Sequence, residues 1–270
     1  MTISIGTMTA RESRGPIVGL GAHLVMMIAL AATAGLTGAG WLAGTAYAIV
    51  LAALLTAGMR RSGMRALGAA NAVTLGRATL VGGVVALAVS SFARPVPLVV
   101  LVTLVGVALA LDGVDGQVAR RTGTTTKLGA RFDMEVDAFL ILVLSVYIAG
   151  TFGWWTVAIG AFRYVFVAAS WAWPWLNAPL PPKFARKVVA AVQGVVLVVA
   201  TASLLPDTLN LLAVAGALIS LTWSFGTDVA WLWRTEQDRR VAAARARIAQ
   251  HRAVTVPRQR RTRQPAPASV

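Results

Sequence analysis

The stretch LDGVDGQVARRTGTTTKLGARFDMEVDAF, residues 111–139, places four aspartates in an otherwise apolar part of the chain. Asp112 and Asp115 are three residues apart, and Asp133 and Asp137 are four apart, so each pair lies on one face of a helix. The polar loop between the two pairs is too short to let the helices diverge. We therefore expect two antiparallel neighbouring helices whose four carboxylates face a common point.

Four carboxylates so close together at the edge of an apolar region repel one another unless they are protonated or neutralised by cations. Clustered oxygen ligands without His or Cys favour Mg²⁺ or Mn²⁺ over zinc, and two such ions can clamp a phosphoryl group during its transfer. The small residues Gly116, Ala119 and Gly129 share these helix faces and leave room for a ligand or for close helix contact. Arg120 is placed to hold a phosphate through two hydrogen bonds.

Two other interpretations of the aspartates stay open. In a purely structural role they would cap helix ends and pair with Arg120, Arg121, Lys127 and Arg131. Glu135 is expected to pair with Arg131 one turn away. Acidic residues inside membranes also mark proton or cation pathways. The number and the spacing of the aspartates favour a binding or catalytic site.

Outside this stretch the composition indicates an integral membrane protein. Of the 270 residues, 57% are hydrophobic and only 13% are charged, with a mean hydropathy of +0.71, whereas a soluble domain carries about 25% charged residues. Long uncharged runs recur along the chain, as membrane-spanning helices require. There is no cysteine, which excludes disulfides and thiolate metal sites.

The uncharged runs predict an all-α, polytopic transmembrane helical bundle. A β-barrel is not expected because the period-2 pattern of barrel strands is missing. Eight spans of about 20 residues are predicted: Ile17–Leu36, Trp41–Gly58, Ala72–Phe92, Pro97–Ala119, Gly129–Gly150, Trp154–Trp173, Lys187–Leu204 and Thr208–Trp233.

Lysine and arginine residues predict the orientation. With the N-terminus inside, nearly all of them, Arg77 included, fall on one side of the membrane; Arg94 alone falls on the other side, and Arg163 lies within a span. This asymmetry follows the positive-inside rule and predicts that both termini and the aspartates face the cytoplasm.

The tail after Trp233 contributes much of the net charge of +15. Its first part, residues 234–252, has the composition of a basic helix, and the Pro- and Arg-rich remainder is expected to be disordered. Attraction to anionic lipid headgroups explains the charge. Nucleic acid is not an expected partner, because the tail has no aromatic residue for base stacking.

The motif D-x2-D-G-x2-A-R-x8-G-x3-D-x3-D is complete in residues 112–137. It resembles the motif of the CDP-alcohol phosphatidyltransferase family. The resemblance implies a six-helix core over residues 71–233. Two extra N-terminal spans and a basic linker would occupy residues 17–70, with a cytoplasmic N-terminus (1–16) and a basic, largely disordered cytoplasmic tail (234–270) on either side.

The resemblance also implies roles for individual residues. Asp112, Asp115, Asp133 and Asp137 would bind two Mg²⁺ or Mn²⁺ ions, with Asp137 also acting as the catalytic base. A second set would surround the CDP-lipid: Asn71, Thr74, Gly116, Ala119, Arg120, Thr126 and Gly129. For Asn71, a helix N-cap is an equally good interpretation.

The implied reaction is metal-dependent transfer of a phosphatidyl group from CDP-diacylglycerol to a polar alcohol, with release of CMP. Arg163, whose charge lies inside an apolar span, and Lys187 resemble family residues near the acceptor, and Gln193 resembles a family glutamine. The acceptor itself stays open among inositol phosphate, glycerol phosphate, serine and other alcohols. Alternatives are another CDP-alcohol as donor, or a non-catalytic transporter or scaffold. A homodimer and a location in the cell (inner or plasma) membrane are further expectations from the resemblance.

Overall fold

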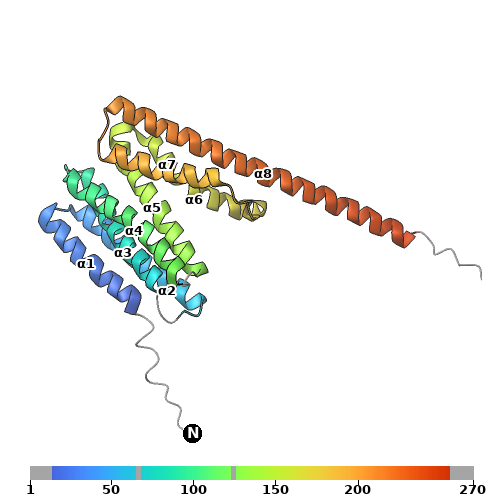
Figure 1. The fold of residues 1–270 in the computed structure, drawn as a ribbon, viewed down its shortest axis with the longest axis horizontal. Helices are drawn as coiled ribbons and strands as arrows, with labels where there is room; N and C mark the ends of the chain where they lie inside the picture. Colours follow the sequence, from blue (N-terminus) through green and yellow to red (C-terminus); the bar gives the residue numbers. More distant parts are fainter. Residues whose placement is uncertain (1–13, 65–67, 123–125, 256–270) are drawn as a thin grey trace, which may run out of the picture. The chain divides into compact units, whose positions relative to one another are not determined.

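The computed structural model describes residues 14–64, 68–122 and 126–255, and within them all side chains except those of 14, 69, 115–122 and 252–255. These ranges form eight α-helices, two short 3-10 helices and no strand, which confirms the predicted all-α class (Figure 1). In chain order they are α1 (Arg14–Thr33), α2 (Gly38–Arg61), α3 (Ala69–Ser91), α4 (Leu98–Thr122), α5 (Lys127–Phe152), η1 (Trp154–Thr156), α6 (Val157–Ala172), η2 (Pro174–Asn177), α7 (Phe184–Thr201) and α8 (Asp207–Thr255).

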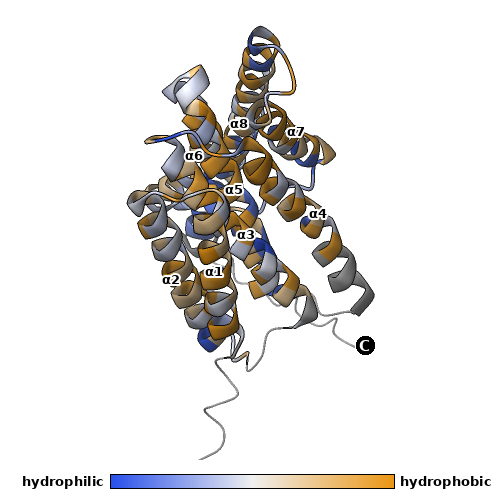
Figure 2. Cartoon of the chain, turned by 90° about the vertical axis from the view of Figure 1, so that its left-hand side faces the viewer, coloured by the Kyte–Doolittle hydropathy of each residue, from blue (hydrophilic) through white to orange (hydrophobic). Residues whose placement is uncertain are grey.

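Each of the eight predicted spans corresponds to one of these helices. Within the described residues, seven helices are long and apolar enough to cross a membrane. The eighth, α4, offers a shorter apolar segment, Leu98–Val114, which already contains the first aspartate of the motif. Apolar residues follow the helices for most of their length (Figure 2). The fold is therefore that of a multi-pass membrane protein.

The chain divides into two compact units, of which the first comprises Met1–Ala168 and Lys183–Ser224. Within this unit, α3 packs against α1, α2, α4 and α5. In α3, 72% of the most apolar segment is buried. The corresponding share is 39% in α5 and 28% or less in the other long apolar helices. The helix that opens the predicted six-helix core is thus the centre of this unit.

The end of α3 is tied to the chain between α1 and α2. The Ser90 hydroxyl accepts a hydrogen bond from the backbone N–H of Thr37 (3.1 Å), which is the N-cap of α2. The guanidinium of Arg94 donates to the carbonyl of Ala34 (3.0 Å), just after α1. These bonds satisfy polar groups at helix ends and attach the two N-terminal helices to the core.

Contact between α5 and α6 depends on Gly160. A Cβ at this position would lie within 3.0 Å of the Leu142 backbone and 2.7 Å from the Ser145 hydroxyl oxygen. Just before α6, the Thr156 hydroxyl donates to the Ser145 carbonyl (2.9 Å). Small residues therefore let α6 approach α5 closely.

The second unit comprises Ala169–Pro182 and Phe225–Val270. Here α8 continues without interruption to Thr255, past the predicted span end at Trp233. Residues 234–255 contain no Gly or Pro and are rich in Ala and Arg, which favours a helix. The predicted basic helix is present, whereas a largely disordered tail is wrong for 234–255; residues 256–270 lie outside the described residues.

Candidate active site

The first three turns of α3 carry three of the polar residues at the site. Gly68, not Asn71, is the N-cap of α3, so the N-cap interpretation of Asn71 is wrong. Asn71 is inside the first turn and buried. The Thr74 hydroxyl donates to the Ala70 carbonyl (3.1 Å), one turn back in the same helix. Arg77 follows three residues later, on the same helix face as Thr74.

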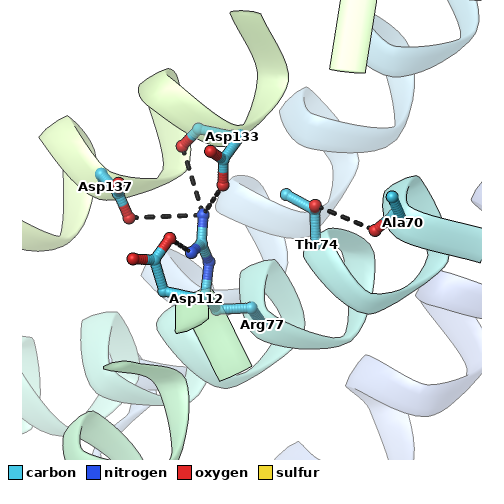
Figure 3. A network of polar contacts seen from close by, with 6 residues as sticks. All are labelled: Ala70, Thr74, Arg77, Asp112, Asp133 and Asp137. Atoms are coloured by element: carbon cyan, nitrogen blue, oxygen red, sulfur yellow. Dashed lines mark hydrogen bonds and ion pairs between the residues drawn. The ribbon is translucent and has the colours of Figure 1, made fainter. Parts of the chain in front are cut away.

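Arg77 lies at the centre of the aspartate cluster (Figure 3). Its Nη1 donates to Asp112 Oδ1, and its Nη2 donates to Asp133 Oδ1. The same Nη2 is 3.3 Å from the Asp133 carbonyl oxygen and 3.3 Å from Asp137 Oδ1. One guanidinium on α3 thus bridges carboxylates from α4 and α5.

The two sides of this cluster differ in exposure. The Arg77 side chain is 1% exposed, whereas the side chains of Asp112, Asp133 and Asp137 are 42%, 40% and 44% exposed. The cation therefore approaches from the interior of the bundle, and the carboxylates remain accessible from outside. Such an arrangement can bind a further charged ligand without first unpacking the helices.

The start of α5 fixes the direction of Asp133 and Asp137. Thr126 is the N-cap, and its hydroxyl accepts a hydrogen bond from the backbone N–H of Gly129 (2.9 Å). A Cβ at Gly129 would lie 3.2 Å from Asn71 Cγ and closer still to Asn71 Oδ1. The glycine thus lets α5 contact Asn71 on α3, which brings three of the predicted donor-site residues together.

The carboxylates fit the expected divalent cation. Among the described residues, Asp112, Asp133 and Asp137 each offer an oxygen, and the three ligand atoms lie within 4.8 Å of one another. Oxygen-only ligands match Mg²⁺ or Mn²⁺, which keep positions for water and phosphate oxygens. These oxygens already pair with one cationic group, the Arg77 guanidinium.

Four predicted residues, Asp115, Gly116, Ala119 and Arg120, lie in the last turns of α4, where only the backbone is described. The helix includes all four positions and continues to Thr122. Their side chains lie outside the described residues.

Arg163 on α6 pairs with Glu135, which was expected to pair with Arg131. Its Nη2 forms an ion pair with Glu135 Oε1, and its Nε is 3.4 Å from Glu135 Oε2. Its Nη1 is 3.0 Å from the Met134 sulfur. The expected Glu135–Arg131 pair is therefore replaced by a pair between α5 and α6. Close packing at Gly160 brings α6, and with it Arg163, within reach of Glu135.

Lys187 and Gln193, the two residues of α7 that resemble family residues, have different surroundings. Lys187 is exposed in the first turn of the helix. Gln193 is buried, and its amide donates to the Ala217 carbonyl (2.9 Å) and the Ser220 hydroxyl (3.2 Å) of α8. Gln193 therefore joins two helices, and Lys187 stays available to a ligand.

Sequence reasoning missed Arg77. From the charge distribution Arg77 was expected among the cytoplasmic charges, and Arg163 was expected to be the one charge within a span. Arg77 instead lies inside the apolar segment Ala70–Ser91 and is almost fully buried. The signal was present, because Arg77 follows Asn71 by six residues within an apolar run. A buried charge in a span calls for a partner, and the aspartates are that partner.

The fold and the site describe a helical membrane protein in which carboxylates cluster where three helices meet. The chain belongs to the CDP-alcohol phosphatidyltransferase family, whose model matches residues 67–227, more than half of its length. The match begins just before α3, so α1 and α2 precede it, and it ends within α8. No curated protein and no solved structure matches the chain.

Proposed function

We propose that the protein transfers a phosphatidyl group from CDP-diacylglycerol to the hydroxyl of a polar alcohol and releases CMP. The observation that carries the proposal is the convergence of Asp112, Asp133 and Asp137 within one family-matched unit. The family uses CDP-alcohols and alcohol acceptors and generally depends on divalent metal ions. The apolar helices give a reason for a lipid donor, because its acyl chains stay in hydrocarbon while its headgroup reaches the polar end of the helices.

Asp112, Asp115, Asp133 and Asp137 would hold two Mg²⁺ or Mn²⁺ ions. Bound divalent ions supply charge neutralisation for the pyrophosphate and for the leaving CMP. Asn71, Thr126 and Gly129 meet where α3 contacts the start of α5 and would border the nucleotide, together with Thr74 one turn further along α3. Gly116, Ala119 and Arg120 would border the pyrophosphate from α4.

The reaction is a substitution at phosphorus. The acceptor oxygen forms a bond to the β-phosphorus, the bond from that phosphorus to the bridging oxygen breaks, and CMP leaves with the electron pair. Asp137 takes the hydroxyl proton of the acceptor as the new bond forms. Its side chain is 44% exposed, so an acceptor can reach it.

Arg163 and Lys187 are the proposed acceptor-binding residues. The Arg163 side chain is 29% exposed although it is paired with Glu135, so a ligand can approach this ion pair. Lys187 is exposed at the start of α7, which packs against α4 and α5. Two cations suit a phosphorylated alcohol better than a neutral one.

The proposed location is the cell (inner or plasma) membrane, with the site and both termini on the cytoplasmic side, as the distribution of Lys and Arg favours. The proposed catalytic core is residues 71–233. Residues 17–70 would add two membrane helices and a basic linker, and the terminal segments 1–16 and 234–270 would lie in the cytoplasm.

The test is CMP release from the purified protein in nanodiscs with CDP-diacylglycerol, Mg²⁺ or Mn²⁺, and a panel of acceptors. The panel contains inositol phosphate, glycerol phosphate, serine and inositol, and the lipid products are identified by their headgroups. Asp112→Asn is the inactive reference. Asp207→Asn is the matched control, because Asp207 is an exposed aspartate in the first turn of α8.

We expect metal-dependent CMP release that Asp112→Asn abolishes and Asp207→Asn leaves intact. Release only with a water-soluble CDP-alcohol would change the proposed donor. Metal binding without CMP release from any donor would contradict an enzymatic function.

A further inference from the structure

Arg77 contacts all three described carboxylates. Its terminal nitrogens pair with Oδ1 of Asp112, Asp133 and Asp137. The guanidinium comes from the buried side, and the carboxylates are open on the other side. An ion that approached from the exposed side would meet the carboxylates across from the buried guanidinium.

The charges of the three carboxylates favour a neighbouring cation even before a metal ion binds. Three carboxylates whose ligand oxygens lie within 4.8 Å repel one another, and their partial burial limits the screening of this repulsion by water. They come from two different helices, so repulsion would separate α4 from α5 or turn the side chains apart. One guanidinium offsets part of this charge and leaves a net attraction for divalent ions.

We infer that Arg77 is a positioning residue that assembles the metal site in the metal-free protein. It holds the aspartates of α4 and α5 at ligand spacing and remains in place when ions bind. This inference rests on the metal site of the proposed function. Arg77 lies on a third helix and outside the aspartate motif, and it would act on the ions only through their carboxylate ligands.

The planar guanidinium is essential to this role. Its two terminal nitrogens reach Asp112 on one helix and Asp133 on the other at the same time. A lysine ammonium keeps the charge but is a single point, and it cannot match the fixed fork of two donors. Arg77→Lys therefore separates the geometry of the bridge from its charge.

The first experiment measures Mn²⁺ binding by electron paramagnetic resonance in wild type, Arg77→Lys and the control Arg60→Lys, whose arginine is exposed near the end of α2. We expect Arg77→Lys to raise the Mn²⁺ dissociation constant about 10- to 100-fold, as loss of partners behind metal ligands does. Arg60→Lys should leave it unchanged. An unchanged constant would show that Arg77 does not position the ligands, and a lower one would show that it competes with the ion; either result would overturn the inference.

Kinetics provide a second readout that loss of folding would not imitate. In Arg77→Lys the Mg²⁺ concentration for half-maximal CMP release should rise by a similar factor, and excess Mg²⁺ should restore most of kcat. A lowered kcat at an unchanged Mg²⁺ requirement would contradict positioning.

The third experiment needs no variant of Arg77 and no activity. The chain has no native cysteine, so spin labels at Val107→Cys on α4 and Ala130→Cys on α5 report the distance between the helices. We expect one narrow distance in EDTA that stays the same with Mg²⁺. A broad distribution that narrows only with Mg²⁺ would show that the metal, not Arg77, assembles the site. This result is independent of whether CMP is released.

Discussion

The guanidinium of Arg163 on α6 forms an ion pair with the carboxylate of Glu135 on α5, between the positions of Asp133 and Asp137. Residues two apart on a helix point to different sides, so Glu135 faces α6 while Asp133 and Asp137 face Arg77. One turn of α5 thus carries both the candidate metal ligands and the anchor of the candidate acceptor residue. This arrangement keeps Arg163 next to the candidate site without placing it among the candidate metal ligands.

Arg163→Ala should raise KM for a phosphorylated acceptor about 10-fold or more, because a hydrogen bond to a charged group contributes roughly 1.5–3 kcal/mol. The KM for CDP-diacylglycerol should change little. Glu135→Gln is the control, because it removes the ion pair and leaves the guanidinium. Equal losses in both variants would assign Arg163 a structural role only.

Asp137→Asn should lower kcat about 100-fold or more, because the amide cannot accept the acceptor proton and general-base catalysis contributes roughly 10²–10⁴-fold. Binding of CDP-diacylglycerol, measured by thermal stabilisation, should remain detectable. Asp207→Asn should behave as wild type in both measurements. A turnover near the wild-type rate would remove Asp137 as the base.

Gly129→Ala should disturb the contact between α3 and α5, since its Cβ would lie 3.0 Å from the Thr126 hydroxyl oxygen and nearer to Asn71 Oδ1. We expect a lower Tm and a higher KM for the CDP-lipid, with a destabilisation of about 1–3 kcal/mol as overpacking costs. Asn71→Ala in the same chain should restore part of the Tm, because it removes the clashing amide. Strictly additive effects would show that the two residues do not contact each other.

Gly160→Ala should destabilise the protein by about 1–3 kcal/mol, because the methyl group would press against the backbone of α5 near Leu142. Gly106→Ala is the matched control, since nothing lies within 4 Å of a Cβ there. That substitution should be neutral or stabilise slightly. Thermal unfolding in detergent compares the two, and equal Tm values would contradict the close α5–α6 contact.

The orientation can be tested in membrane vesicles, because the chain has no cysteine of its own. Ser62→Cys after α2 and Ala93→Cys after α3 both lie at exposed positions. An impermeant maleimide should label Ser62→Cys only in inside-out vesicles and Ala93→Cys only in right-side-out vesicles. The reverse pattern would place the aspartates outside the cell.

Local sequence pattern was sufficient for the helices. Every predicted span became a helix, because a backbone in hydrocarbon must satisfy its own hydrogen bonds and long apolar runs leave it no other means. The motif spacing was sufficient to bring Asp112, Asp133 and Asp137 together, since helical periodicity and a short loop fix which faces meet. The end of α8 was misjudged because apolarity marks the end of a span, not the end of a helix.

Tertiary packing alone decided which charges pair. Arg77 meets Asp112 and Asp133 across 35 and 56 residues of sequence, and Arg163 meets Glu135 across 28. For Glu135, helical periodicity favours Arg131, which lies one turn away, and gives no sign of Arg163. The choice depends on which helices pack side by side and how closely small residues such as Gly129 and Gly160 let them approach. The sequence by itself determined the helices and the aspartate faces, whereas the packing of α3, α5 and α6 determined the counter-charges, because a buried charge is stabilised by the partner that the fold brings within reach.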